Sequence, residues 1–460
     1  MIRFFNAYFP TRTVLLGASE AVLTTAAFVL AIIAAMGPFD ARMFIGYEQG
    51  GDRIALVVCV FIMCMYYFDL YDSTVLRSQR EVFTRLIQVF GAVCIILALV
   101  YSLFPAMRLQ QNVFGAGALA AASVTVLWRR LFSLVSTWPL FMERVLVLGD
   151  GVLAQNLLKE IHDRRELGIQ VVAHISEDQD WSSWQRPGMP AFAAEIDRVT
   201  RVLRVRRIIV SMKERRGRLP VESLLALKKR GVMIQDGSEL YQIITGKISL
   251  DSLLPSMLLF SPGFQVSRLF LLYKRTFSLV FSAVALLLTF PLMLLQAVVI
   301  RLDSPGPSIF RQRRIGKDGK IFTLYKFRSM YEGVDGDRPA AKDDARCTRV
   351  GRWLRASRLD ELPQLWNIFR GDMHLVGPRP FVPEQEAKLA DEIPFYSLRW
   401  SVRPGATGWA QVNRGYCSTL AENAEKLAYD LFYIKNLSVG LDLLVIFKTV
   451  KILLLGRGAR

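Results

Sequence analysis

The sequence has few cysteines and comparatively few acidic residues. Its five cysteines include no pair at CxxC or zinc-ligand spacing: Cys59, Cys64 and Cys94 lie in apolar runs, and Cys347 and Cys417 lie far apart. This pattern argues against a disulfide framework and against a metal cluster. The 40 acidic residues are outnumbered by 58 Lys and Arg, which gives a net charge of +18. Such a balance suits a protein that faces anionic head groups or substrates, although charge alone does not separate these from nucleic acid.

Long apolar stretches concentrate near the N-terminus. Hydrophobic residues make up 52% of the chain, and its mean hydropathy of +0.30 is too apolar for a typical soluble enzyme. Four stretches approach or exceed the roughly 20 residues that a membrane-spanning helix needs. They cover residues 14–36, 54–70, 82–104 and 113–135. We therefore expect a four-helix transmembrane bundle over residues 1–140, whose first stretch is too long to be a cleavable signal.

Basic residues flank these four stretches unequally. The loops expected on the outer side are short and carry fewer of them. Those at the inner ends are Arg3, Arg12, Arg77, Arg80, Arg85, Arg129 and Arg130. The positive-inside rule therefore places both ends of the bundle in the cytoplasm.

After the bundle the sequence takes on the pattern of a soluble α/β domain. An apolar strand over residues 144–148 runs into a glycine turn and then an amphipathic helix. These elements predict a small parallel sheet, and hence a small Rossmann-like α/β domain over residues 141–262. The remaining elements expected there are strands at 169–175, 207–211 and 232–235 and a helix at 221–230.

The glycine turn has two interpretations. Gly149, Gly151 and Ala154 fit a dinucleotide-binding turn, in which small residues let a phosphate approach a helix N-terminus. The same pattern fits a tight strand-to-helix turn that binds nothing. We favour the second interpretation, because no ribose-binding acid is clearly placed and the GxGxxA pattern is a weak signal.

A fifth apolar stretch, residues 277–300, has basic residues on both sides and is interrupted by Pro291. A proline inside a helix removes a hydrogen bond and kinks the axis. A full crossing would place everything after Arg301 outside the cell. A re-entrant helix over about residues 274–300, which enters the inner leaflet and returns, keeps the remainder in the cytoplasm and is the topology we expect.

The polar C-terminal part of the chain is dense in short motifs. Lys326 and Arg328 lie on either side of an aromatic residue. Arg352, Arg355 and Arg358 recur at a spacing that would place them on one face of a helix. Together these cations offer anion-binding capacity near a membrane, although each taken singly is more often a solvated or lipid-facing charge.

The adjacent carboxylates Asp360 and Glu361 are the most specific indication of a catalytic site. The apolar residues around them recur at helical spacing, which puts both carboxylates near a helix start with Pro363 in the first turn. Asp360 could be an ordinary N-cap, which stabilises a helix by about 1 kcal/mol. Pro363 has no N–H for such a cap to bind, but the N–H of Leu362 remains available. A helix N-terminus also attracts phosphate, as a carboxylate nucleophile for phosphoryl transfer requires. Glu361 can supply an oxygen ligand to Mg²⁺.

Two glycine- and proline-rich motifs follow. Pro378 and Pro380 stiffen the backbone around Arg379 and can present its guanidinium to a phosphate, while a plain exposed turn fits equally well. The segment 403–412, which contains Gln411, is either a nucleotide-binding turn or a structural turn against the membrane.

In this order the motifs resemble those of the bacterial polyprenyl-phosphate glycosylphosphotransferases, specifically the large exopolysaccharide-type sugar transferases. The resemblance covers roughly residues 268–460. The N-terminal sequence MIRFFNAYFPTR resembles the N-terminal sequences of the subgroup found with exosortase (PEP-CTERM) loci. The motifs that carry the main resemblance are KRTFS, SPGPSIFRQRRIG, YKFRSM, RLDELPQLWN, GDMHLVGPRP, RPGATGWAQV and YDLFYIKNLS.

The resemblance implies a two-step reaction that uses Mg²⁺ and a UDP-sugar. Asp360 would attack the β-phosphorus to form a phosphosugar-aspartyl intermediate with loss of UMP, and polyprenyl phosphate would then attack that intermediate. Glu361 would hold Mg²⁺, and Pro291 would break the re-entrant helix. The implied substrate-binding residues are Lys326, Arg328, Arg355, Pro378, Arg379, Pro380 and Gln411.

The resemblance also implies an architecture and a location. An α-rich catalytic domain with the re-entrant helix would cover residues 263–460 and face the cytoplasm from the bacterial inner membrane. Membrane lipid and a second copy of the chain are the expected partners, and nucleic acid is not one. Two departures from the family pattern, Asn413–Arg414–Gly415 and Phe381, leave the transferred sugar open.

Two other classes of protein compete with this interpretation. One is a membrane scaffold of a polysaccharide assembly system that kept the fold and lost the chemistry, and the intact Asp360–Glu361 pair speaks against it. The other is a nucleotide-sugar dehydratase or epimerase, which needs a Tyr-x-x-x-Lys pair. Tyr241 and Lys247 come nearest to that pair but have the wrong spacing.

Overall fold

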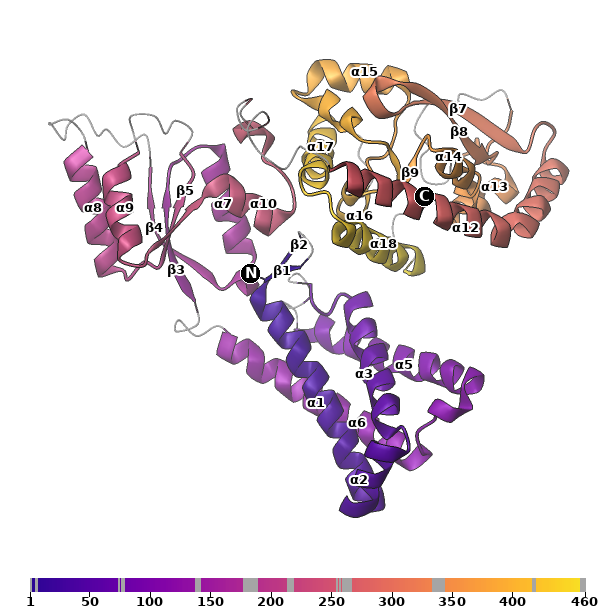
Figure 1. Cartoon of the computed structure of the whole chain (residues 1–460), viewed down its shortest axis with the longest axis horizontal. Coiled ribbons are helices and arrows are strands. Elements are labelled where there is room, and N and C mark those ends of the chain that lie inside the picture. The colour runs from indigo at the N-terminus through magenta and orange to yellow at the C-terminus, as the bar shows by residue number, and fades with distance from the viewer. Residues whose placement is uncertain are drawn as a thin grey trace. The chain divides into compact units, whose positions relative to one another are not determined.

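The chain folds into two compact units, of which the first is mainly Tyr8–Gly237 and the second mainly Ser238–Arg460. The boundaries expected after residues 140 and 262 both fall outside the described residues, as does Cys417. The computed structural model (Figure 1) describes residues 2–4, 7–72, 75, 79–136, 142–176, 189–212, 219–253, 255, 258, 267–332, 344–415 and 419–455.

The N-terminal part of the first unit is a bundle of long apolar helices. Four are long and apolar enough to cross a membrane, in agreement with the four predicted stretches. Gly37, with φ 83°, ends the first long helix. Pro38 then begins a short helix, which leads to the second long helix. The helices are α1 (Thr11–Met36), α2 (Pro38–Tyr47), α3 (Gly50–Tyr67), α5 (Gln79–Leu103) and α6 (Gln111–Ser136).

A buried ion pair joins α1 to α6. Arg129 Nε donates to Glu20 Oε1 at 2.6 Å, and both side chains are almost fully buried. The same arginine donates to the carbonyl oxygen of Leu70 at 2.9 Å, and Tyr71 donates to Glu20 Oε2 at 2.7 Å. A charge inside an apolar bundle is costly unless it is paired, so these contacts fix how α1 and α6 pack.

The remainder of the first unit is the small parallel sheet that the sequence predicts. Its strand order is β4-β3-β5-β6, and all three pairings are parallel. Helices α8 and α9 lie on one side of the sheet and α7 on the other (Figure 1). The elements are β3 (Glu143–Leu148), α7 (Val152–Asp163), β4 (Ile169–Ile175), α8 (Met189–Val202), β5 (Arg207–Val210), α9 (Val221–Lys229) and β6 (Met233–Asp236).

The second unit begins with α10 (Gly237–Thr245). The segment that follows this helix packs on the C-terminal helices. The backbone N–H of Ile248 donates to the carbonyl oxygen of Ala428 at 3.0 Å, and Trp409 Nε1 donates to that of Gly246 at 2.7 Å. Residues 238–253 therefore belong to the core of this unit, although the sequence alone groups them with the α/β domain.

One long helix, α12 (Arg268–Asp303), is the fifth that could span a membrane. It continues through Pro291 without a break in its helical assignment. Most of its large apolar side chains from Val280 to Leu302 are exposed within the unit, as expected for a helix that contacts lipid. Pro291 therefore interrupts the hydrogen bonding of α12 but does not end the helix.

The elements after α12 build a compact domain around two small sheets and a helical core. Strands β7 and β8 form an antiparallel hairpin, and β9 pairs in parallel with β10. Its elements are β7 (Ile309–Ile315), β8 (Ile321–Phe327), α13 (Arg349–Ala356), α14 (Gln364–Arg370), β9 (His374–Val376), α15 (Pro383–Glu392), β10 (Gly405–Thr407), α16 (Trp409–Asn413), α17 (Leu420–Lys435) and α18 (Val439–Leu454).

Candidate active site

Asp360 and Glu361 lie in a single 3-10 turn, Leu359–Glu361, between α13 and α14. Arg358 opens this turn with φ 57°, a left-handed conformation that is strained for a residue with a side chain and is often found at functional sites. Both carboxylates lie near the start of α14, as expected, but in a separate 3-10 turn before it, and Pro363 takes the N-cap position of α14 instead of a place in its first turn. No side chain caps either element, so Asp360 is not an N-cap.

Two cations converge on Glu361. Lys326 Nζ and Arg379 Nη2 each donate to Glu361 Oε1 at 3.0 Å. Burial alone would raise the pKa of Glu361, but the charges of Lys326 and Arg379 outweigh it and hold that pKa well below its ordinary value. Glu361 is therefore ionised, and three residues far apart in the sequence meet at one carboxylate oxygen.

Asp360 has the opposite electrostatic setting. Burial and the neighbouring charge of Glu361 raise the pKa of Asp360 to about 6, and Lys326, Arg355 and Arg379 oppose that rise. A carboxylate held at a raised pKa beside several cations is a stronger base and nucleophile than a solvated one. The site thus holds two adjacent carboxylates whose pKa values are shifted in opposite directions, which is typical of paired catalytic acids.

The arginines after Thr348 are placed differently from the prediction. Arg352 and Arg355 lie on α13, but that helix ends at Ala356, so Arg358 does not share its face. Arg355 Nη1 lies 3.1 Å from Cys347 Sγ and acts on Asp360 through its charge. Of the three, Arg355 is the one that the structure brings to the carboxylates.

Asn367 fixes the turn against the strand that carries Lys326. Its side chain is fully buried, its Nδ2 donates to the carbonyl oxygen of Thr323 at 2.7 Å, and its Oδ1 accepts from the backbone N–H of Tyr325 at 3.1 Å. These two bonds tie α14 to β8. An asparagine between the apolar residues Trp366 and Ile368 was the available sequence signal for this role, but it does not reveal the partner.

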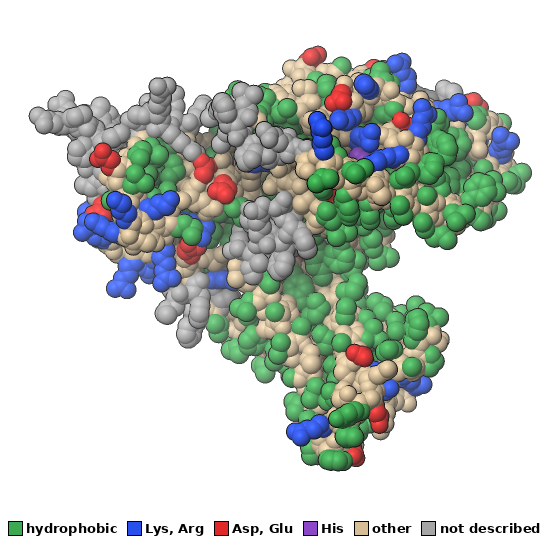
Figure 2. Space-filling model, in the orientation of Figure 1, with side chains coloured by type: hydrophobic (Ala, Val, Ile, Leu, Met, Phe, Trp, Pro, Cys, Tyr) green, Lys and Arg blue, Asp and Glu red, His purple; other side chains and the backbone are tan. Residues whose placement is uncertain are grey.

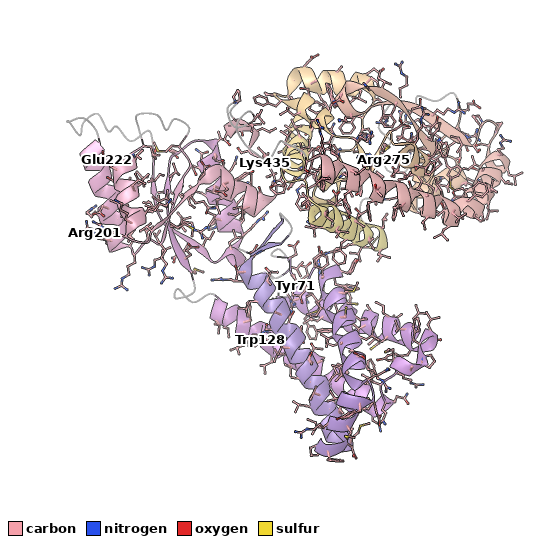
Figure 3. All side chains as sticks on the ribbon, viewed as in Figure 1. Tyr71, Trp128, Arg201, Glu222, Arg275 and Lys435 are labelled. Atoms are coloured by element: carbon pink, nitrogen blue, oxygen red, sulfur yellow. The ribbon has the colours of Figure 1, made fainter. Side chains whose placement is uncertain are left out.

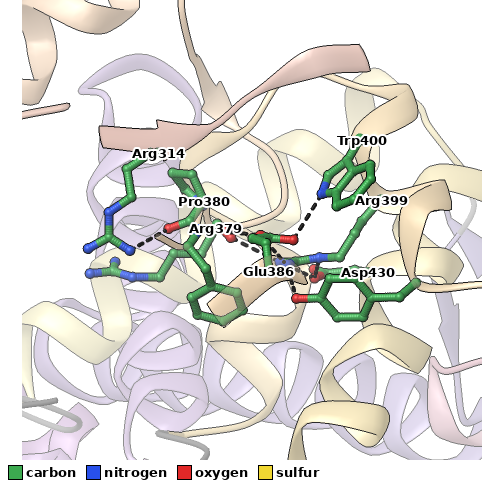
Figure 4. Close-up of polar contacts among 9 residues, drawn as sticks. Arg314, Arg379, Pro380, Glu386, Arg399, Trp400 and Asp430 are labelled. Carbon is green, nitrogen blue, oxygen red and sulfur yellow. Dashed lines mark hydrogen bonds and ion pairs between the residues drawn. The ribbon is translucent and has the colours of Figure 1, made fainter. Parts of the chain in front are cut away.

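The turn that carries Arg379 is held through its backbone (Figure 4). Arg399 Nη2 donates to the carbonyl oxygen of Arg379 at 2.9 Å, and Arg314 Nη1 donates to that of Pro380 at 3.2 Å. The N–H of Phe381 donates to Glu386 Oε1 at 3.3 Å. Pro378 accepts from the N–H of Gly405 at 3.0 Å. The two prolines thus shape the turn, and a buried network fixes it in place.

That network centres on Arg399, which sequence reasoning missed. Its guanidinium lies 2.9 Å from Glu386 Oε1 and 3.0 Å from Asp430 Oδ2, and all three side chains are at most 3% exposed. Tyr396 Oη accepts from Arg399 Nη1 at 2.7 Å, and Trp400 Nε1 donates to Glu386 Oε2 at 2.9 Å (Figure 4). The partners come from α15, α17 and the segment between them, so no local pattern could show that they meet.

Two other predicted substrate-binding residues, Arg328 and Gln411, form no hydrogen bond to the carboxylates in the described part of the chain. Arg328 is buried, and Nη2 and Nη1 donate to the carbonyl oxygens of Ser304 at 2.6 Å and Pro305 at 2.8 Å, so it holds the end of α12. Gln411 Nε2 donates weakly to the carbonyl oxygen of Ala406 at 3.3 Å, and its Oε1 is buried without a partner. The structure thus gathers Lys326, Arg355 and Arg379 around the carboxylates, and it gives Arg328 structural partners.

Comparison with known proteins gives a family match. The bacterial sugar transferase family matches residues 269–456. An "Exopolysaccharide production protein PSS" of Rhizobium leguminosarum bv. phaseoli is 43% identical over 188 residues, which are 39% of this chain and 94% of that protein. The chain belongs to the bacterial sugar transferase family.

Two further relatives differ in the share of the chain that they match. The "UDP-N-acetylgalactosamine-undecaprenyl-phosphate N-acetylgalactosaminephosphotransferase" of Aeromonas hydrophila is 42% identical over 48% of this chain, and the chain spans about half (52%) of its length. The "UDP-glucose:undecaprenyl-phosphate glucose-1-phosphate transferase" of Xanthomonas campestris pv. campestris is 28% identical over 94% of this chain and 93% of its own length. This second likeness extends the sugar transferase resemblance to the N-terminal unit.

The donor set suits a magnesium ion bound together with substrate phosphates. Among the described residues no group of three metal-ligating side chains occurs. Mg²⁺, however, is commonly held by one or two carboxylates plus phosphate oxygens and water. Glu361 Oε1 accepts hydrogen bonds from Lys326 and Arg379. Within the described part of the chain, Glu361 Oε2 accepts no hydrogen bond. Glu361 therefore fits such an ion through that second oxygen.

The glycine turn of the α/β domain favours the structural interpretation. Gly149 has φ 107°, and a Cβ there would lie 2.7 Å from the backbone nitrogen of Met212, so the close packing requires glycine. Asp150 accepts from Ser176 Oγ at 2.6 Å at the start of α7, where a dinucleotide phosphate would bind. A carboxylate in that position repels phosphate.

Proposed function

We propose that this sugar transferase moves a sugar 1-phosphate from a UDP-sugar to polyprenyl phosphate and releases UMP. The observation that carries the proposal is the pairing of Asp360, whose pKa is raised to about 6, with Glu361, which is ionised and held by Lys326 and Arg379. The names of the relatives, which are undecaprenyl-phosphate sugar phosphotransferases and an exopolysaccharide production protein, support this chemistry and a role in starting exopolysaccharide repeat units.

In the first step, an oxygen of the Asp360 carboxylate attacks the β-phosphorus of the UDP-sugar. A bond forms between that oxygen and phosphorus, the bond from phosphorus to the bridging oxygen breaks, and UMP leaves with the electron pair. In the second step, a phosphate oxygen of the polyprenyl carrier attacks the same phosphorus. The Asp360–phosphorus bond then breaks, and the carboxylate is restored.

The surrounding cations stabilise the charge that develops on the phosphoryl oxygens. Arg379 and Lys326 are fixed by Glu361, and Arg355 adds a third charge near Asp360. Fixed cations need no reorganisation when charge develops, which is the main contribution of a protein to phosphoryl transfer. A magnesium ion held by Glu361 would neutralise diphosphate charge in the bound UDP-sugar.

The proposed topology places this site at the cytoplasmic face of the bacterial inner membrane. Nucleotide sugars are cytoplasmic, so α12 is proposed to enter and leave the membrane on the same side, with Pro291 at its turning point. We also propose that the α/β domain is Rossmann-like and that the chain forms a homodimer. The names of the relatives differ in the sugar, so the hexose remains to be measured.

The rival function is an inactive scaffold of a polysaccharide assembly system. We would incubate purified full-length protein and Mg²⁺ with a panel of UDP-sugars and undecaprenyl phosphate, and measure UMP release and sugar phosphate in the lipid fraction. Acceptor-dependent release with at least one UDP-sugar, lost in Asp360→Asn and reduced in Glu361→Gln, supports the enzyme. Equal UMP release by wild type and the folded Asp360→Asn protein rules it out.

A further inference from the structure

A second cationic group of the C-terminal unit lies at the opposite end of α14 from the carboxylates. Arg275 of α12 (Figure 3) donates from Nη1 to the carbonyl oxygen of Ile368 at 2.7 Å and from Nη2 to that of Phe369 at 2.8 Å. These carbonyls end α14, whereas Asp360 and Glu361 precede its start. A helix of this length spans about 10 Å, so Arg275 marks a place separate from the carboxylates.

A buried histidine lies beside Arg275. The N–H of His374 donates to the carbonyl oxygen of Pro404 at 2.8 Å, and the next residue, Leu375, donates to Ser278 Oγ, one turn along α12 from Arg275. His374 is 3% exposed, and its Nδ1 is buried with no hydrogen-bond partner. Burial and the nearby positive charges lower the pKa of His374 to about 3, so the ring is neutral. A neutral ring protonated on Nδ1 can donate one hydrogen bond.

Positive charge around His374 exceeds what the nearby acids balance. Lys274 is matched by Asp442, whose Oδ2 lies 2.9 Å from its Nζ. Arg403, just before Pro404, forms no hydrogen bond or ion pair with any residue the structure describes. Its positive charge repels that of Arg275 and disfavours protonation of His374. The acid that attracts Arg275 is Asp372. Asp372 Oδ2 also lies 3.8 Å from Arg370 Nε, so this carboxylate does not balance Arg275 alone, and an added anion would stabilise the group.

The cationic group lies beside exposed apolar surface. Trp366 and Phe369 of α14 stack with ring centroids 5.6 Å apart and are 49% and 37% exposed. Figure 2 shows Lys and Arg side chains gathered next to a belt of hydrophobic side chains on this unit. Exposed aromatic side chains beside arginines are typical of the membrane–water interface, where lipid phosphates lie.

We propose that Arg275, Arg403 and His374 bind the phosphate of an anionic membrane phospholipid, whose acyl chains lie over Trp366 and Phe369. The two guanidiniums supply charge and donors, and His374 Nδ1–H supplies a third donor. Polyprenyl phosphate has the same phosphate chemistry, but as acceptor its phosphate must reach Asp360 at the other end of α14. The bound phospholipid would fix α12, α14 and the β9–β10 pair at the bilayer surface, whatever reaction the carboxylates perform.

The test measures lipid binding and needs no enzymatic activity. Radiolabelled phosphatidylglycerol is titrated onto the purified full-length chain in phosphatidylcholine mixed micelles. Arg403→Gln is expected to weaken phosphatidylglycerol binding about fivefold, because one interfacial charge is lost. Arg403→Lys should retain most of the affinity. Lys388→Gln, which removes an exposed positive charge from α15, is the control and should leave binding unchanged.

Three outcomes overturn the proposal. In the first, Arg403→Gln and Lys388→Gln bind phosphatidylglycerol equally well. In the second, undecaprenyl phosphate displaces phosphatidylglycerol one for one, which would assign the site to the acceptor. In the third, Arg403→Lys loses as much affinity as Arg403→Gln, which points to a general loss of structure. Because the readout is bound lipid, a failed transferase assay leaves this test intact.

Discussion

Arg399 Nη2 donates a hydrogen bond to the backbone carbonyl oxygen of Arg379 at 2.9 Å. One buried arginine thereby holds the backbone of another whose guanidinium reaches Glu361. Arg399 touches neither carboxylate of the site, so it is a positioning residue. It links the stability of the domain core to the geometry of the proposed phosphate-binding turn.

Arg399→Met is expected to destabilise the protein strongly. Glu386 and Asp430, each 2% exposed, would lose their shared partner, and breaking a buried ion pair from one side costs about 3–5 kcal/mol. Unfolding of the purified chain, followed by near-UV circular dichroism, measures the effect. Lys388→Gln, an exposed change on the same helix as Glu386, should change stability by less than about 0.5 kcal/mol. A loss of the same size in both variants would contradict the role of the network.

The buried ion pair Lys274–Asp442 joins α12 to α18, and its contribution to stability can be tested. Asp442 also accepts from Tyr433, which lies near the carbonyl oxygen of Val376. Lys274→Met alone leaves the buried charge of Asp442 without its cation and should cost about 3–5 kcal/mol. The double variant Lys274→Met/Asp442→Leu should recover most of that loss, since it leaves no unpaired charge. A double-mutant cycle on unfolding free energies measures this, and no recovery would show that the pair is not coupled.

His374 makes folding stability depend on pH. Its folded-state pKa of about 3 lies below the ordinary value of 6.5, so protonation favours the unfolded chain. The contribution of His374 to stability should therefore be full above about pH 6.5 and fall by about 1.4 kcal/mol for each pH unit down to about pH 3. The raised pKa of Asp360 acts in the opposite direction below about pH 6, so the contribution of His374 is the difference between wild type and His374→Gln. Denaturation in detergent without anionic lipid measures the slope. His374→Gln should flatten this part of the curve, and an unchanged slope would contradict the assignment.

Cysteine labelling tests the re-entrant topology of α12. In a variant whose native cysteines are replaced by serine, Asp318→Cys is placed after α12, where the side chain is 61% exposed. A membrane-impermeant maleimide should label it in inverted vesicles and not in spheroplasts. Tyr47→Cys, on the proposed outer side of the bundle and 81% exposed, should show the reverse pattern. Labelling of Asp318→Cys only from the periplasmic side would establish a full crossing.

The sequence predicted elements whose signals are local. Hydropathy identified the four N-terminal helices and α12, and strand and helix patterns located β4 at its observed bounds and α9 within one residue. The start of α14 was misplaced, because the apolar spacing continues through the 3-10 turn that carries Asp360. Periodicity alone does not reveal that Arg358 adopts a left-handed conformation and separates α13 from that turn.

The site was predicted in its residue types and only partly in its contacts. Lys326, Arg379 and Glu361 were each proposed from their motifs, and the structure joins them at one oxygen atom. Arg328, two residues from Lys326, instead holds the end of α12. Sequence cannot separate these neighbours, because which partner a strand residue meets depends on tertiary packing. The same limit hid Arg399, whose side-chain partners are spread over 45 positions from Glu386 to Asp430.

The most direct test of the proposed mechanism is to trap sugar phosphate on Asp360. Purified full-length protein is mixed with Mg²⁺ and a UDP-sugar labelled at the β-phosphorus, without polyprenyl phosphate, and quenched in denaturant. The label should remain on the chain and map by mass spectrometry to the peptide that contains Asp360. Adding polyprenyl phosphate before the quench should move it to lipid, and Asp360→Asn should acquire none. Acceptor-dependent transfer with label absent from Asp360 at every time point would contradict the mechanism.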